Sequence, residues 1–152
     1  MIKIVIPIEP KGQMRPRARR SGNRAVVYEH EKMRPWRKLA TSLVKKAYEG
    51  DVLTGALRLD VTFYMRAPKK ISERPTPRAK AKTWQRYKRF ACEEMYVATK
   101  PDLDNLEKAI YDSVSDALTV WHDDCQIVEH TTRKKYSPRP RIEIEIEELD
   151  EL

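Results

Sequence analysis

The residues best suited to chemistry are two pairs of aspartates and one lysine. Asp102 and Asp104 follow Pro101, and Lys108 lies four positions after Asp104. A proline favours extended backbone in the residue before it, and side chains two positions apart in an extended segment share one side. The helical pattern begins only after Asp104. We therefore expect Asp102 and Asp104 to converge just before a helix, with Lys108 one helical turn further on.

The second pair, Asp123 and Asp124, precedes a predicted strand. In an extended chain only one of the two can point toward the first pair, and spacing alone does not say which. Gathered carboxylates repel one another unless a cation neutralises them, and their hard oxygens suit Mg²⁺ or Mn²⁺. Such a metal activates water and stabilises a leaving oxygen, and a nearby lysine stabilises developing charge. The pattern therefore indicates phosphoryl chemistry.

The same residues have a purely structural interpretation. Asp104 and Glu107 have the spacing of a capping box, and Lys108 can pair with Asp112 one turn later. An Asp-x-Asp pair also occurs in unrelated metal sites. On spacing alone, helix caps and ion pairs remain an open alternative to a catalytic site.

Charge is unevenly distributed along the 152 residues, whose net charge is +8. Residues 11–38 carry 10 Lys/Arg against 2 Asp/Glu, and residues 66–100 carry 11 against 3. Residues 101–152 reverse the balance, with 6 against 14. Basic segments attract polyanions, so nucleic acid is the favoured partner.

Several classes of protein are excluded by composition. No apolar run approaches the roughly 18 residues that cross a bilayer, and the apolar start is too short for a signal peptide. Two cysteines, Cys92 and Cys125, and three histidines argue against a disulfide scaffold or a structural zinc site. We expect a cytoplasmic protein that has no contact with a membrane.

Apolar periodicity places the elements that must position the acids. Alternation predicts strands over 2–8, 57–65, 125–136 and 141–147, with a short strand at 25–28. Helical spacing predicts helices over about 30–48 and 104–118. Residues 13–24 look like a basic loop. In the basic segment 67–100, a helix over 78–95 either covers the core or forms a mobile lid.

We predict a single α+β domain over residues 1–152. A mixed, mainly antiparallel sheet of four or five strands is covered by two or three helices, with the acids near one end of the sheet. The last two strands are expected to form a hairpin in which Arg133 and Lys135 face Glu143, Glu145 and Glu147. That glutamate row is interpreted as a solvated strand face rather than a metal site.

One stretch resembles a known family. Residues 100–108, Lys-Pro-Asp-Leu-Asp-Asn-Leu-Glu-Lys, followed by Asp-Asp-Cys-Gln-Ile at 123–127, resemble the signature of the RusA-type Holliday junction resolvases, which are often prophage-encoded. The layout is similar over nearly the whole chain. The resemblance implies a RusA-like fold and a homodimeric, Mg²⁺-dependent endonuclease. Such an enzyme cuts two opposed strands of a DNA four-way junction in recombination and repair.

The resemblance also implies roles for individual residues. Asp102, Asp104 and Asp124 would bind the metal, and Lys108 would be the catalytic lysine. Asn105 would support the site. Asp123 would be the less favoured member of its pair.

The sequence departs from the family's pattern in the length of segment 67–100, which is longer than in compact members, and in the residues before the first aspartate. The best-known member has an arginine run directly before its first aspartate, whereas residues 98–101 read Ala-Thr-Lys-Pro here. We therefore expect DNA contacts from Lys100 of this stretch and from basic residues outside it: Arg15, Arg17, Arg19, Arg20, Lys69 and Lys70.

Two other functions compete with the endonuclease. One is a non-catalytic nucleic-acid-binding module whose acids serve as helix caps and salt-bridge partners. The other is a different metal-dependent nuclease or phosphotransferase. The PD-(D/E)xK pattern is set aside, because Glu107 and Lys108 lack the intervening residue.

Overall fold

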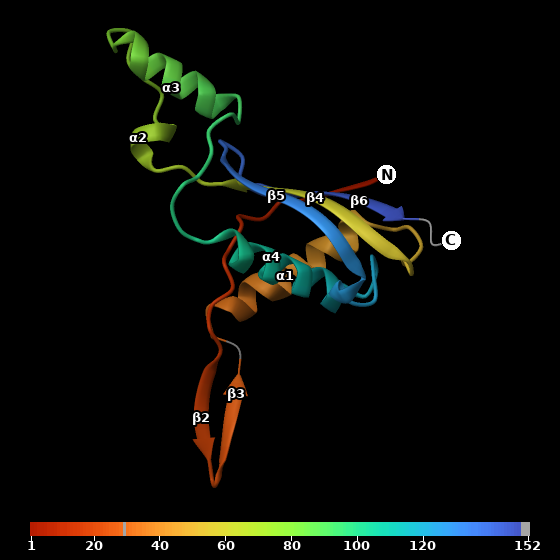
Figure 1. The fold of residues 1–152 in the computed structure, drawn as a ribbon. Helices are drawn as coiled ribbons and strands as arrows, with labels where there is room; N and C mark the ends of the chain where they lie inside the picture. The colour runs from red at the N-terminus through yellow and green to blue at the C-terminus, as the bar shows by residue number, and fades with distance from the viewer. Residues whose placement is uncertain (29, 150–152) are drawn as a thin grey trace. The chain divides into compact units, whose positions relative to one another are not determined.

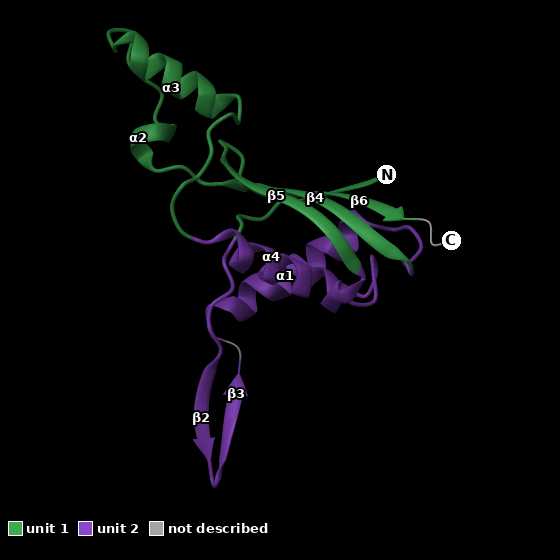
Figure 2. Ribbon diagram, viewed as in Figure 1, with its two compact units in different colours: residues 1–10, 55–100, 127–152 green, residues 11–54, 101–126 purple. Residues whose placement is uncertain are grey.

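The computed structural model describes residues 1–28 and 30–149. The chain forms two compact units, each built from separated stretches of sequence (Figure 2). The first unit contains residues 1–10, 55–100 and 127–152, and the second contains residues 11–54 and 101–126. The single-domain organisation stays a prediction.

The first unit is built on a four-stranded sheet (Figure 1). Its strands are β1 (Ile2–Ile6), β4 (Ala56–Met65), β5 (Ile127–Tyr136) and β6 (Arg141–Leu149), in the order β1-β6-β4-β5. The pairs β1–β6 and β4–β6 are antiparallel, and β4–β5 is parallel. The predicted α+β class, with a mixed and mainly antiparallel sheet, is confirmed.

The apolar alternation of the strands sets the register of the sheet. Ile144 of β6 lies opposite Ile4 on one side and Val61 on the other. Ile142 likewise lies between Ile6 and Phe63. These side chains are almost completely buried. A one-residue slip would turn the whole apolar set to the other face, so burial specifies this pairing strongly.

The glutamate row of β6 lies on the other face of the sheet and forms ion pairs. Lys3 Nζ lies 3.4 Å from Glu143, and the Arg58 guanidinium lies 3.0 Å from Glu147. This row is therefore a charged strand face, but its glutamates are half-buried rather than fully solvated as predicted.

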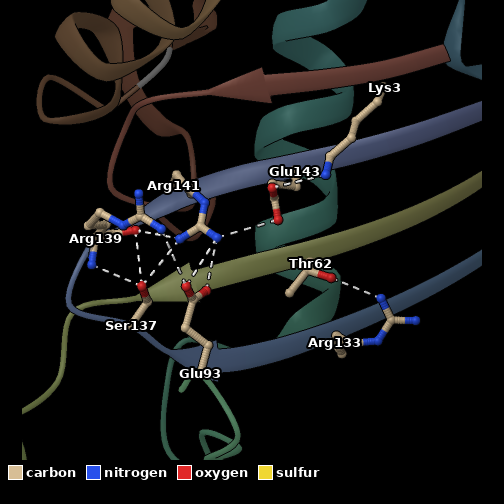
Figure 3. A network of polar contacts seen from close by, with 8 residues as sticks. All are labelled: Lys3, Thr62, Glu93, Arg133, Ser137, Arg139, Arg141 and Glu143. Carbon is tan, nitrogen blue, oxygen red and sulfur yellow. Dashed lines mark hydrogen bonds and ion pairs between the residues drawn. The ribbon is translucent and has the colours of Figure 1, made fainter. Parts of the chain in front are cut away.

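The expected hairpin between the last two strands is wrong, because β4 lies between β5 and β6. Arg133 therefore faces β4 and donates hydrogen bonds to Asp60 (3.1 Å) and to Thr62 (2.9 Å), the latter drawn in Figure 3. Lys135 lies over the ring of Tyr96, 5.4 Å from its centroid. Alternation identifies the buried face of a strand but not its neighbours, so a short connection was mistaken for a hairpin turn.

The segment between β4 and the second unit carries two helices, α2 (Lys69–Ser72) and α3 (Ala81–Ala91). They project beyond the end of the sheet (Figure 1). Trp84 and Tyr87 meet edge to face, and Tyr87 contacts Phe90, which is buried. Phe90 is therefore a packing residue of this segment.

Glu93, just after α3, joins this segment to the sheet (Figure 3). Both of its carboxylate oxygens accept hydrogen bonds from the Arg141 guanidinium, at 2.9 and 3.3 Å. Arg141 also lies over the Tyr64 ring, 3.8 Å from its centroid. Glu93 has a φ of 61°, an unusual value for a non-glycine residue. The ion pair holds the chain in this left-handed turn.

Residues just after Glu93 then pair with the last residues of β5, at the edge of the sheet. The N–H of Tyr136 donates to the carbonyl of Met95 (2.9 Å), and the N–H of Val97 donates to that of Lys134 (3.1 Å). Exposed strand edges invite unwanted pairing, so this short bridge protects the edge.

The second unit contains helices α1 (Met33–Ala47) and α4 (Leu103–Ala117), the 3-10 turn η1 (Asp124–Gln126), and the strands β2 (Arg17–Ser21) and β3 (Arg24–Tyr28). The helices α1 and α4 pack together. Ala40 and Val44 are buried on α1, as are Ile110 and Val114 on α4. Neither of these helices, nor any other in the described residues, is long and apolar enough to cross a membrane.

Residues 17–21 form a strand rather than the predicted basic loop. Every residue of β2 is exposed, as are four of the five in β3. A ribbon exposed on both faces has no apolar alternation, which is the signal that identifies a half-buried strand.

Candidate active site

The helix α4 begins at the first aspartate pair. Asp102 is its N-cap residue, with φ −69° and ψ 149°, so the chain is extended at Asp102 as predicted, but Asp104 lies in the first turn of the helix and not before it. The Asp102 carboxylate makes no capping hydrogen bond. The capping-box alternative, with Asp104 as the cap, is wrong because the helix begins earlier. The Asp104 carboxylate instead accepts a hydrogen bond from the N–H of Asn105 (2.9 Å).

A short strap of residues 11–14 lies against this helix start. The N–H of Gln13 donates to the carbonyl of Asn105 (2.9 Å). A side chain on Gly12 would place its Cβ 2.8 Å from the Cβ of Pro101, closer than real Cβ contacts. Glycine is therefore required here so that the strap can approach the helix.

One turn further along α4, Lys108 forms an ion pair with Asp112 at 3.4 Å. Arg37 of α1 lies 3.4 Å from Asp112 and 3.8 Å from Asp116, and it donates to the Gln13 side-chain carbonyl (2.9 Å). Sequence reasoning anticipated the Lys108–Asp112 pair but missed Arg37 and Gln13. Helical spacing shows only pairs within one element, so it gives no signal for partners on α1 or the strap.

The second aspartate pair lies in a loop that is organised by Gln126. Its side-chain carbonyl accepts hydrogen bonds from the N–H groups of His122 (2.8 Å) and Asp123 (3.2 Å). Its amide donates to the carbonyl of Leu53 (3.0 Å). Gln126 belongs to the Asp-Asp-Cys-Gln stretch of the sequence, but nothing in the spacing indicated this positioning role.

Asp123 and Asp124 are hydrogen-bonded to each other, and the bond raises the pKa of Asp124. Burial and the nearby charge of Asp112 raise that pKa further, whereas the Lys108 ammonium lowers it. The backbone N–H of Cys125, together with the bond to Asp124, lowers the pKa of Asp123. Asp124 is therefore the carboxyl that holds a proton more tightly, as expected of acids gathered without a cation.

The structure brings Asp124 within electrostatic range of Lys108 and Asp112. Across residues 1–28 and 30–149, however, no three acidic, histidine or cysteine side chains gather into a metal-type cluster. The donor chemistry still fits Mg²⁺, because the candidate ligands are all carboxylates and the Asp102 carboxylate is not engaged in capping.

The predicted DNA-binding residues occupy both units. Arg15, Arg17, Arg19 and Arg20 are exposed in the second unit. Arg17 donates to His30 (3.0 Å), and the Arg19 guanidinium lies 5.8 Å from the centroid of the Tyr28 ring. Lys69, Lys70 and Lys100 are exposed in the first unit.

The match of the chain to a family model places the protein in the class of the endodeoxyribonucleases. Residues 7–147 match the family described as endodeoxyribonuclease RusA, and the chain belongs to that family. It is also 26% identical over 148 residues to the uncharacterized protein YqaN of Bacillus subtilis (strain 168). That match covers 97% of this chain and 96% of the relative.

Proposed function

We propose that this protein is a Mg²⁺-dependent, structure-specific endodeoxyribonuclease that resolves DNA four-way junctions by paired nicks, in recombination and repair. Membership of the RusA family supports nuclease action on DNA. The observation that supports this site is the start of α4, where the Asp102 carboxylate is not engaged in capping and Lys108, 3.4 Å from Asp112, lies one turn beyond Asp104.

In this proposal Asp102, Asp104 and Asp124 hold the metal, and Asp123 supports Asp124. When bound, the metal activates water and stabilises the leaving oxygen.

Lys108 acts on the reacting phosphate in this proposal. Its ammonium, 3.4 Å from Asp112, neutralises the negative charge that develops there. Asn105 supports the site through its backbone, because its carbonyl fixes the strap at the start of the helix.

The proposal includes a homodimer. A four-way junction is symmetric, and cutting two opposed strands requires two equivalent active sites related by a two-fold axis. Arg15, Lys69, Lys70 and Lys100 provide phosphate contacts outside the reacting centre.

The test is a strand-cleavage assay on a synthetic four-way junction, with linear duplex of matched sequence beside it, with and without Mg²⁺. The unmodified protein should make paired symmetric nicks on the junction only. Asp102→Asn should abolish the nicks yet bind the junction at least as tightly, because removing a negative charge favours a polyanion. Glu94→Gln, which also neutralises one carboxylate but on an exposed residue of the first unit, is the matched control and should cut normally.

Two outcomes would contradict the proposal. Full Mg²⁺-dependent cleavage by Asp102→Asn would place the active site elsewhere. Tight junction binding without cleavage under any metal would favour the non-catalytic binding module.

A further inference from the structure

The second unit carries a two-stranded ribbon, here called the hairpin arm, that consists of β2 and β3. It forms a sheet of its own and pairs with no other described strand. A two-residue turn, Gly22-Asn23, joins the strands, and Gly22 has a φ of 61°. An isolated two-stranded ribbon is only marginally stable in water. A binding partner that covers the arm would therefore stabilise it.

The register of the arm sorts its cationic side chains by face. Arg17 lies opposite Tyr28, Arg19 opposite Val26, and Ser21 opposite Arg24. Alternation places all six on one face, which we call the guanidinium face because it holds three of the four arginines. Arg20, paired with Ala25, lies on the opposite face. No acidic residue occurs between Lys11 and Tyr28.

The base of the arm adjoins the candidate active site. A pocket of about 270 Å³ is lined by Val27 and Tyr28 of β3 and by Lys108 and Asp112 of α4. All four residues belong to the second unit. A polyanion that binds along the arm can therefore extend as far as Lys108.

We propose that the hairpin arm lies in the major groove of a DNA duplex, with its guanidinium face toward the base edges, and so holds one duplex arm of the substrate beside Lys108. This proposal rests on the proposed function only in taking the substrate to be DNA. It adds a mode of binding and a source of sequence preference, because arginine reads guanine by paired hydrogen bonds to O6 and N7.

The dimensions of the grooves in nucleic acids favour insertion of the arm into the major groove of DNA. The major groove of B-form DNA is about 12 Å wide and admits a two-stranded ribbon, whereas the minor groove, about 6 Å wide, does not. Double-stranded RNA has a deep, narrow major groove that side chains cannot read. The arm should therefore distinguish duplex DNA from duplex RNA of the same sequence, which phosphate attraction alone does not do.

The test measures binding at one fixed salt concentration to a linear DNA duplex and to an RNA duplex of the same sequence. Asp102→Asn is the parent protein, so binding is measured without cleavage. Adding Arg17→Ala and Arg19→Ala should weaken DNA binding about 100-fold, at roughly 10-fold for each arginine, and RNA binding less than 10-fold. Arg20→Ala on the opposite face should cost less than Arg19→Ala. Lys45→Ala with Lys46→Ala removes two charges from the end of α1 and serves as the control.

A second readout is amide hydrogen exchange in residues 17–28, which should slow when the parent protein binds duplex DNA. Groove insertion would be overturned if the variants lost equal affinity for DNA and for RNA. It would also be overturned if Arg19→Ala and Arg20→Ala weakened DNA binding equally, or if the parent protein did not bind DNA. Thermal unfolding of each variant checks that the rest of the chain stays folded. Failure of the proposed function is distinguishable, because it appears as missing cleavage by the unmodified protein.

Discussion

Lys108 and Asp112 lie one turn apart on α4, with the ammonium 3.4 Å from the carboxylate, and Arg37 lies 3.4 Å from the same carboxylate. One acid is thus shared by two cations from different helices. Arg37 is held in turn by Gln13. Lys108 is therefore positioned by a network that runs through α1 and the strap, and not by its own helix alone.

Replacing Lys108 with alanine should lower the rate of junction cleavage about 10²- to 10³-fold, the usual cost of removing one group that stabilises transition-state charge. Junction affinity should change only a few-fold, because many other cations contact the phosphates. Single-turnover cleavage and a binding titration separate the two effects. Lys46→Ala, at the exposed end of α1, should leave the rate unchanged. Equal rates for both variants would remove Lys108 from the mechanism.

Mg²⁺ should raise the melting temperature of the unmodified protein, because a ligand that binds only the folded state stabilises it. At a concentration 100 times the Kd the gain is about 2.7 kcal/mol. Asp124→Asn should abolish most of this shift, whereas Asp116→Asn should retain it. Thermal unfolding against Mg²⁺ concentration measures both. A shift that is unchanged in Asp124→Asn would exclude that residue as a ligand.

Gly12→Ala should displace the strap, because the new Cβ would come within 2.8 Å of Pro101. The hydrogen bond from Gln13 to Asn105 would then be strained or lost, at a cost of about 1 kcal/mol in unfolding free energy. Cleavage should fall as well, since Gln13 holds Arg37. Gly22→Ala is the comparison for backbone strain without a clash. A Cβ at Gly22 would meet nothing within 4 Å, but the residue has a positive φ. Unchanged stability in Gly12→Ala would show that the strap adapts.

The Asp60–Arg133 pair should make stability depend on acid pH. The hydrogen bond from Arg133 lowers the pKa of Asp60 below its unfolded value, which is about 3.9. The contribution of the pair to the free energy of unfolding is therefore fully present above the unfolded pKa. It is lost as pH falls through the lower pKa of the folded state. The difference in melting temperature between the unmodified protein and Asp60→Asn should shrink below about pH 4. A difference that stays constant from pH 6 to pH 2.5 would contradict this assignment.

Glu93→Gln should destabilise the protein by about 1–3 kcal/mol. The pair with Arg141 is mostly buried, and breaking a fully buried pair costs about 3–5 kcal/mol because one charge stays behind. Urea unfolding measures the change. Glu94→Gln, the exposed neighbour, should have almost no effect. A double-mutant cycle with Arg141→Met should show that most of the cost belongs to the pair.

Much of the fold follows from local patterns. The alternation of Leu57 to Met65 predicted β4, and the helical spacing after Asp104 predicted α4 to within one residue. Apolar burial is periodic within each of these elements, so the sequence alone records it.

Relations between distant elements were not predictable in the same way. The insertion of β4 between β5 and β6 depends on which strand edges meet, and periodicity does not encode that choice. The candidate site shows the same limit. Spacing indicated Asp102, Asp104 and Lys108, but the contacts of Arg37 and Gln126 arise from tertiary packing.

The segment between β4 and α4 is hydrogen-bonded at two points to the same end of β5. One attachment lies where the segment leaves the sheet, and the other lies where it returns. The N–H of Ser137 bonds to Met65 at departure, and Met95 and Val97 bond to β5 on return. Closing a flexible loop costs only about 0.6 kcal/mol more for each doubling of its length. The number of residues between these two attachments can therefore change at little cost in loop closure, whereas Glu93, which lies between them, still ties the segment to Arg141 of the sheet.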